Sequence, residues 1–264
     1  GRPVALATWF GADTLGRLID FHMNDSGVYI TPASRGASHT STALARLDEN
    51  GAASYTFDLE WAPAAPIEVP ETAQILEAGS ISAIIEPGAS AVLDALTRGR
   101  EHALVFFDPN ARPSIMGEPA VALVSLERFI ALADVVKVSD EDIEWLTGGA
   151  PIDKVVDRWL RLGPSLVVVT RGKHGSDVAT ASGVRFTKTP SDVKVVDTVG
   201  AGDSFMGGMI DAMWGMGLRG ADAREALRSL SEEQARAIID RASAVSDVTV
   251  SRKGANPPWA HELS

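Results

Sequence analysis

Short, unbroken apolar runs alternate with helical patterns along most of this chain, and this alternation limits its fold more than any other feature. The apolar runs cover residues 81–85, 103–107, 133–138 and 166–170. Runs rich in β-branched residues are typical of strands buried on both faces, as in a parallel sheet. The helical patterns cover residues 89–98, 126–132, 140–146, 152–162, 203–213 and 232–244. Strand–helix–strand units at this spacing predict an α/β fold with helices on both faces of the sheet.

The composition supports a folded protein and excludes several other classes. With 264 residues, of which 45% are hydrophobic, the chain can fill the core of one large domain or two small ones, so disorder is excluded as its main character. No stretch approaches the roughly 18 uninterrupted apolar residues of a membrane span, and we expect no signal peptide. The chain has no cysteine, which excludes disulfides, cysteine-bound zinc and a thiol nucleophile and favours an intracellular location.

The charge balance is acidic. The chain carries 35 Asp and Glu against 24 Lys and Arg, a formal net charge of -11. This argues against a general binder of nucleic acid or of anionic membranes, so we expect neither among its partners. An anionic small ligand held by a local cluster remains compatible with the balance.

One stretch departs from the strand–helix alternation. Residues 41–47 and 52–57 have strand patterns, and the turn between them contains Asn50-Gly51, a pair that suits a tight hairpin. Two interpretations stay open. The hairpin forms an edge without a function, or it forms part of a lid over a site at the carboxyl ends of the parallel strands.

The segment 195–208 carries the richest chemistry. A β-branched run is followed by the turn Gly200-Ala201-Gly202 and then by a helical pattern that starts at Asp203. Such a turn places backbone N–H groups at a helix N-terminus, where an anion is favoured, and the glycines allow it to approach closely. Locally, Asp203 suits either a helix N-cap or a catalytic carboxylate. An anion cradle beside a proton acceptor favours the catalytic role.

These residues resemble a known family. Asp-Thr-Val-Gly-Ala-Gly-Asp-Ser-Phe at 197–205 closely resembles the C-terminal signature of the ribokinase-like (PfkB) carbohydrate kinases. Further blocks that resemble the family follow in the same order, at residues 107–113, 137–148, 170–175 and 251–258. The Asp-Pro-Asn-x-Arg block at 108–112 is similar to that of the fructokinase and ketodeoxygluconate kinase branch.

The resemblance implies a fold and an activity. The fold would be a three-layer α/β/α sandwich with a mostly parallel central sheet and a small β lid. The chain, 1–264, would be one kinase domain, with 41–61 as part of the lid. The activity would be transfer of the γ-phosphoryl group of ATP to a hydroxyl of a small sugar, most simply fructose, with 2-keto-3-deoxygluconate kinase or ribokinase as alternatives.

The resemblance also implies roles for single residues. Asp203 would be the catalytic base and would contact the sugar, and the N–H groups of Gly200, Ala201 and Gly202 would form an anion hole. Asn110 and Arg112 would bind substrate or phosphate, with a surface arginine after a Pro-Asn turn as the alternative for Arg112. Phe57 in the hairpin would close over the sugar, or would only form an apolar face of the hairpin.

Nucleotide and metal positions follow from the same comparison. The nucleotide contacts implied are Ser139, Thr170, Gly172, Gly175 and Asn256. Asp142 stands where the family's Asn-x-x-Glu motif has its glutamate, so it would approach Mg²⁺, through a water molecule because its side chain is shorter, or it is an ordinary helix-start carboxylate. Positions that bind K⁺ in relatives are matched by Asp197, Thr198, Thr249, Arg252 and Gly254.

Two alternatives belong to other functional classes. The chain could be a non-catalytic sugar-binding relative, although its intact Gly-Ala-Gly-Asp favours an active kinase. Gly202-Asp203-Ser204 also resembles a block of serine esterases, which would make Ser204 a nucleophile. Such enzymes need a histidine partner, and His261 lacks their Asp-x-x-His spacing.

The resemblance implies three further expectations. Family members begin with a strand that carries a substrate-binding Asp, with lid strands and with a Gly-Gly-x-x-x-Asn block. This chain would therefore be about fifty residues short at its start, which leaves an ordinary domain size. We also expect a homodimer formed through the lid and a cytoplasmic location.

Overall fold

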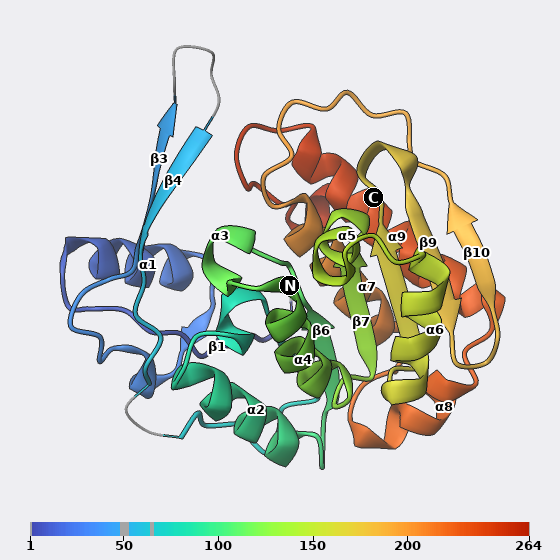
Figure 1. The fold of residues 1–264 in the computed structure, drawn as a ribbon, viewed down its shortest axis with the longest axis horizontal. Helices are drawn as coiled ribbons and strands as arrows, with labels where there is room; N and C mark the ends of the chain where they lie inside the picture. Colours follow the sequence, from blue (N-terminus) through green and yellow to red (C-terminus); the bar gives the residue numbers. More distant parts are fainter. Residues whose placement is uncertain (1, 48–52, 64–65, 264) are drawn as a thin grey trace.

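The computed structural model describes residues 2–47, 53–63 and 66–263. Its centre is a six-stranded sheet in the order β10-β9-β8-β7-β6-β5 (Figure 1). The strands are β5 (Ile75–Gly79), β6 (Leu104–Asp108), β7 (Val135–Ser139), β8 (Leu166–Thr170), β9 (Ser176–Thr180) and β10 (Arg185–Lys188). From β5 to β8 the strands are parallel, whereas β9 and β10 are antiparallel to their neighbours. The predicted, mostly parallel sheet is confirmed.

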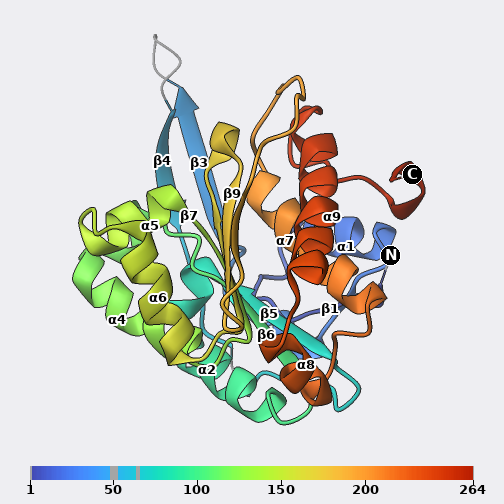
Figure 2. The same cartoon turned by 90° about the vertical axis from the view of Figure 1, so that its right-hand side faces the viewer.

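Helices cover both faces of this sheet, as Figure 2 shows. On one face lie α2 (Gly88–Gly99), α4 (Pro119–Ile130), α5 (Asp140–Thr147) and α6 (Ile152–Leu162). On the other lie α7 (Ala201–Gly215), α8 (Arg224–Arg228) and α9 (Glu232–Val250). Alternate strand residues enter the two cores, so Phe107 packs on the first face and Phe106 on the second. This two-sided burial explains the unbroken apolar runs, and the three-layer prediction is confirmed.

Helices α7 and α9 pack with their backbones in near contact. A methyl group added at Gly208 in α7 would lie 2.7 Å from the Cα of Ala242 in α9. Both helices bury their inner residues completely, among them Met209 and Ile238. The pair therefore forms one rigid layer over the second face of the sheet.

One predicted strand is wrong. Residues 81–85 do not form a strand, because Ser80–Ala83 is a 3-10 helix, and the edge strand is β5, directly before it. Glu77 interrupts the apolar run of β5, so the sequence pattern pointed to the more apolar residues that follow. Ser80 has a positive φ of 54°, which turns the chain sharply at the end of β5.

The N-terminal part stands beside the main sheet. It contains β1 (Ala5–Leu6) and β2 (Tyr29–Ile30), which pair in parallel, and the helix α1 (Thr14–Asp25) between them. The predicted hairpin is confirmed as β3 (Thr42–Leu47) and β4 (Ala53–Asp58), paired antiparallel with Thr42 opposite Asp58. It projects away from the body of the molecule (Figure 1). Its predicted turn, including Asn50-Gly51, lies outside the described residues.

The remaining elements are short. The four-residue helix α3 (Pro113–Met116) follows β6, and 3-10 turns lie at Pro32–Ser34, Gly172–His174, Ala221–Ala223 and Ala260–Glu262. In the described ranges, no helix has both the length and the apolar character needed to cross a membrane.

Candidate active site

The glycine turn at 200–202 opens α7. Gly200 is the N-cap residue with φ of +77°, and α7 begins at Ala201, two residues earlier than predicted. The N–H group of Ala201 donates to the carbonyl oxygen of Thr198. A helix leaves its first N–H groups without intrahelical partners, so those of Gly202 and Asp203 remain to be satisfied by a ligand or water. The structure thus has the predicted glycine turn at a helix N-terminus, and binding of an anion there stays a prediction.

Asp203 lies in the first turn of α7 and its side chain is exposed. Because Gly200 occupies the cap position, the N-cap interpretation of Asp203 is wrong. An exposed carboxylate beside free N–H groups is placed to accept a proton from a hydroxyl group bound at the helix end.

Ser204 does not suit a nucleophile. It is 7% exposed, and its hydroxyl group donates to the carbonyl oxygen of Ala201. A nucleophilic serine must instead reach substrate and donate to a base, so the esterase alternative is wrong.

A buried pair that the sequence analysis did not single out lies beneath this turn. Lys137 Nζ and Asp108 Oδ2 are 2.7 Å apart, and both side chains are almost fully buried. Burial raises the pKa of Asp108 to about 6, opposed by Lys137 and reinforced by the charges of Asp142 and Asp203. Asp108 and Lys137 stand at the starts of the blocks 108–112 and 137–148 that resemble the family, but nothing in the sequence indicates that the two residues form a pair.

Arg112 and Asn110 lie together after β6. The Arg112 guanidinium donates to the side-chain and main-chain oxygens of Asn110, at 2.7 Å and 3.2 Å. Arg112 is exposed at the surface, and Asn110 has a positive φ of 37°. The structure thus brings together the two residues that the resemblance assigned to substrate or phosphate.

Ser139 and Asp142 form the capping box of α5. The Ser139 hydroxyl accepts the N–H group of Asp142, whose carboxylate accepts that of Ser139 in return. The other Asp142 oxygen accepts the N–H group of Ala111. Asp142 therefore holds the loop after β6 against the start of α5, which fits its helix-start interpretation.

Four of the five predicted nucleotide residues, all except Asn256, lie where β7 and β8 end. Thr170 is the last residue of β8 and pairs with Ser139 of β7. The 3-10 turn Gly172–His174 follows, and Gly175 approaches β10 so closely that a methyl group there would be 1.9 Å from the Lys188 carbonyl oxygen. Gly172 and Gly175 therefore form a tight turn directly after the carboxyl end of β8.

The residues assigned to K⁺ surround the segment before α7. The Asp197 carboxylate accepts the N–H groups of Val199 and Gly254, which hold the pKa of Asp197 below its usual range. Thr249 is fully buried, and Arg252 pairs with Glu262. Asn256 lies in the same loop, with its N–H group donating to the Gly254 carbonyl oxygen. The bond from Gly254 to Asp197 therefore joins the segments 197–200 and 249–256, and ion binding there stays a prediction.

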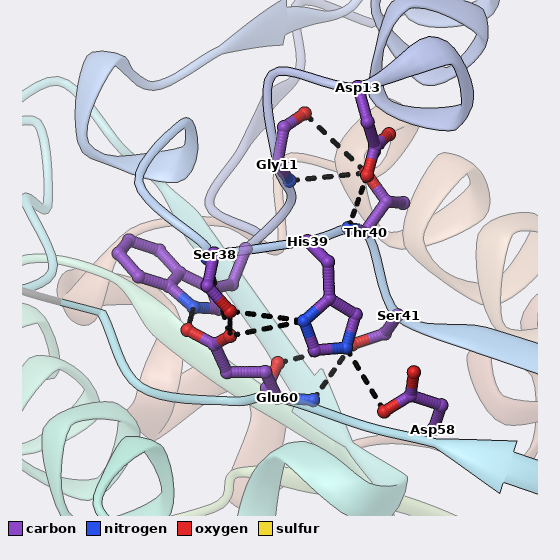
Figure 3. Close-up of polar contacts among 9 residues, drawn as sticks. Gly11, Asp13, Ser38, His39, Thr40, Ser41, Asp58 and Glu60 are labelled. Carbon is purple, nitrogen blue, oxygen red and sulfur yellow. Dashed lines mark hydrogen bonds and ion pairs between the residues drawn. The ribbon is translucent and has the colours of Figure 1, made fainter.

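Polar contacts anchor the base of the β3–β4 hairpin, as Figure 3 shows. We call Ser38, His39, Asp58 and Glu60 the hairpin-base cluster. The Ser38 hydroxyl donates to Glu60 Oε2 at 2.6 Å, and the His39 ring contacts Ser38 and Asp58 at 3.0 Å each. Trp9 donates to Glu60 Oε1 at 2.9 Å, so the cluster ties β4 to the segment before α1.

A second set of contacts lies beside the cluster (Figure 3). The Asp13 carboxylate caps α1 and accepts both the N–H and the hydroxyl group of Thr40. Those bonds lower the pKa of Asp13 to about 2. A cavity of about 260 Å³ at the hairpin base is lined in part by Trp9, Glu60 and Trp61. Phe57 is half-buried in β4.

In the ranges that the structure describes, no three His, Asp or Glu side chains gather as a ready metal cluster. Mg²⁺ in phosphoryl-transfer sites is typically held by one or two carboxylates with substrate phosphates and water, so a dedicated cage is not required by that chemistry.

Comparison with known proteins gives concordant results. Residues 1–262 match the family described as pfkB family carbohydrate kinase. Fructokinase of Rhizobium leguminosarum bv. trifolii is 31% identical over 220 residues, covering 81% of this chain. Fructokinase of Klebsiella pneumoniae is 34% identical over 194 residues, covering 69% of this chain. The chain spans 67% and 61% of the lengths of these two relatives.

A solved structure agrees with the sequence relatives. Fructokinase from Vibrio cholerae O395, in its form with fructose, ADP and calcium ion bound, has a TM-score of 0.75 to this chain at 27% sequence identity. The similarity covers 96% of this chain and 81% of that one.

Proposed function

This chain belongs to the pfkB family of carbohydrate kinases, and we propose that it transfers the γ-phosphoryl group of ATP to a hydroxyl group of fructose. The observation that carries the proposal is the first turn of α7, where an exposed Asp203 stands beside unpaired backbone N–H groups. Fructose is supported by the fructokinase relatives and by the fructose and ADP in the Vibrio cholerae enzyme.

The chemistry follows from these two devices. Asp203 accepts the proton of the attacking sugar hydroxyl, and the N–H groups of Gly202 and Asp203 stabilise the charge on the phosphoryl group in transfer. Phosphoryl transfer needs mainly positioning and charge stabilisation, so the pair suffices chemically once a metal is present. Arg112 adds a planar guanidinium that suits a phosphate or sugar oxygen.

A divalent ion, Mg²⁺ by our proposal, would bind with the nucleotide and neutralise charge on its phosphates. Asp142 accepts one N–H bond on each oxygen, and a carboxylate has further lone pairs, so it can also accept a bond from a metal-bound water. We assign the nucleotide to the strand ends, in contact with Ser139, Thr170, Gly172, Gly175 and Asn256.

A monovalent ion, K⁺ by our proposal, would bind beside the anion hole at Asp197, Thr198, Thr249, Arg252 and Gly254. The lowered pKa of Asp197 supports this, because the carboxylate stays charged. The ion would stabilise the joined segments 197–200 and 249–256, which position the first turn of α7.

We assign the β3–β4 hairpin as part of a lid, with Phe57 closing over the sugar. The projecting position of the hairpin supports this role. Its exposed Leu44, 54% accessible, supports a homodimer formed through the lid. We also propose a cytoplasmic location. The proposed substrates, ATP and a small sugar, are metabolites of the cytoplasm, and a chain without cysteine suits a reducing compartment.

The test is an assay of ADP release with ATP, Mg²⁺ and a panel of sugars: fructose, 2-keto-3-deoxygluconate and ribose. We expect Asp203→Asn to lower kcat by roughly 10²- to 10⁴-fold, because a general base is lost, while nucleotide affinity measured by calorimetry stays near that of the parental protein. The panel separates fructose from the two alternative sugars.

Asp211→Asn is the matched control. It makes the same change in the same helix, where Asp211 pairs with Arg2 and Arg241 at the surface, and kcat should be unchanged. Near-parental turnover by Asp203→Asn would refute the mechanism. Saturable sugar binding without ADP release would favour a non-catalytic sugar-binding protein.

A further inference from the structure

The buried pair of Lys137 and Asp108 has no part in the mechanism described so far. Asp108 is the last residue of β6 and Lys137 is the middle residue of β7, and these two strands are adjacent and parallel. The two side chains are 5% and 6% exposed. Lys137 follows Val135 by two residues and therefore lies on the same sheet face, the one covered by α7 and α9.

The ammonium group of Lys137 reaches the proposed anion hole from below. A methyl group added at Gly202 would lie 2.8 Å from Lys137 Nζ. The ammonium thus occupies the space that a side chain at 202 would need. It places a positive charge next to Gly202, whose N–H group would bind the transferring phosphoryl group.

Fold stability does not account for this pair. The second oxygen of Asp108, Oδ1, is buried, and in the described part of the chain it has no hydrogen-bond partner. Desolvation of a buried ion pair offsets much of its attraction, and an unsatisfied buried oxygen is a further cost. The raised pKa of Asp108 reflects the same imbalance. The buried pair of Lys137 and Asp108 is therefore unfavourable to folding, and we look for its reason in function.

Lys137 also faces an excess of negative charge. Glu77 of β5 is open to solvent at the sheet edge, yet desolvation by the protein around its carboxyl group raises its pKa to about 7. The charges of Asp108 and Asp203 raise it further, and Lys137 opposes them. These three carboxyl groups would oppose the negative charge that develops on the phosphoryl group during transfer. Lys137 is the cation that counteracts them from within the fold.

We propose that Lys137 is a positioning residue for phosphoryl transfer: Asp108 holds its ammonium beneath Gly202, where it fixes the first turn of α7 and adds positive charge to the anion hole. The inference rests on the proposed kinase function. Negative charge develops on the phosphoryl group in the transition state. A positive charge already held at that place stabilises the transition state more than it stabilises the bound substrates. Its loss therefore lowers kcat and leaves KM nearly unchanged.

The test compares the parental protein with Lys137→Met, which keeps the length of the side chain and removes its charge. We expect kcat to fall by roughly 10²- to 10³-fold, as for loss of one anion-hole donor, with KM for ATP and sugar within about threefold. A double variant, Lys137→Met with Asp108→Leu, replaces the whole pair by apolar groups. Such replacements often preserve stability. If the single variant folds poorly, kcat can therefore still be measured in the double variant.

Arg224→Met is the control. Arg224 pairs with Asp134, whose side chain is 4% exposed, at 2.8 Å, so this change also breaks a buried pair, and we place neither residue in the active site. It should lower the melting temperature and leave kcat unchanged. A folded double variant with kcat within about twofold of the parental value would overturn the role of Lys137. A parental protein without activity on any sugar would instead refute the proposed function.

Discussion

Gly200 shows how tightly the backbone around the proposed anion hole is packed. Its φ is +77°, and a methyl group there would lie 2.9 Å from the Cβ and 3.2 Å from the Cα of Ala255. Gly183 has a similar conformation, with φ of +91°, but no atom lies within 4 Å of the position of an added methyl group. The two residues therefore separate the effect of backbone conformation from that of contact.

We expect Gly183→Ala to lower the free energy of unfolding by about 1 kcal/mol, because only the left-handed backbone is penalised. Gly200→Ala should lose more, since Ala255 must also move, and nucleotide affinity should weaken because the 251–256 loop shifts with it. Urea unfolding and calorimetric titration with ADP measure the two effects. Equal losses of stability in both variants would show that the contact with Ala255 is unimportant.

At the scale of residues, the sequence predicted features that depend only on residues next to one another in the chain. Residues 200–203 are contiguous, so their place at a helix start could be inferred directly. Lys137 could not be inferred, because its role depends on β6 and β7 being neighbours and on α7 crossing above them. A single lysine in an apolar run carries no sign of that arrangement.

At the scale of elements, the hairpin-base cluster decides how the proposed lid is held. Glu60 accepts bonds from Trp9 and from both the N–H and hydroxyl groups of Ser38, and those bonds lower the pKa of Glu60. The contacts join β4 to the segment before α1 while leaving the main sheet untouched. No described residue of β3 or β4 belongs to either hydrophobic core, although Trp61 beyond them packs against one, so the two strands can change position with little disturbance of the cores.

Glu60→Ala should loosen the lid and raise KM for the sugar by roughly fivefold, with the melting temperature nearly unchanged because both cores stay intact. Steady-state kinetics and thermal unfolding measure this split. Asp94→Ala removes a comparable surface carboxylate, paired with Arg98 within α2, and should change neither quantity. A drop in melting temperature without a change in KM would mean that Glu60 serves the fold and not the lid.

The elements that were predicted well are those buried on both sides or strongly periodic. Strand β8 and helix α6 have the predicted bounds, because nothing interrupts their patterns. Strand β5 was misplaced because Glu77 breaks its run at the sheet edge. Helix α1 was not predicted, since its apolar residues Leu18 and Phe21 are exposed and do not form a core-facing stripe.

At the scale of the whole molecule, the acidic groups make stability depend on pH in a defined direction. Asp108 titrates at about 6 in the folded protein against an ordinary value of 3.8. The folded state therefore binds this proton more tightly than the unfolded state. Its favourable contribution is complete below pH 3.8 and is lost as the pH rises through 6. Asp13, with its pKa lowered to about 2, contributes above pH 3.8 and loses its contribution below.

We therefore expect the free energy of unfolding to fall as the pH rises from 4 to 7, and Asp108→Asn to flatten that slope. Urea unfolding at half-unit intervals of pH measures it. Asp94→Asn, a surface change in α2, should leave the slope as it is. Stability that stays constant or increases over this range would contradict the assigned burial of a charged Asp108.

The close packing of α7 on α9 has a consequence for how the molecule opens. Helices whose backbones nearly touch cannot part without exposing both apolar faces, so the turn at 200–203 and the loop after α9 belong to one cooperative unit. The hairpin, held by surface polar bonds, belongs to the least stable part of the same chain. The hairpin that we propose as a lid can thus fluctuate locally, while the helix start that we propose as the catalytic site loses its structure only when the whole domain does.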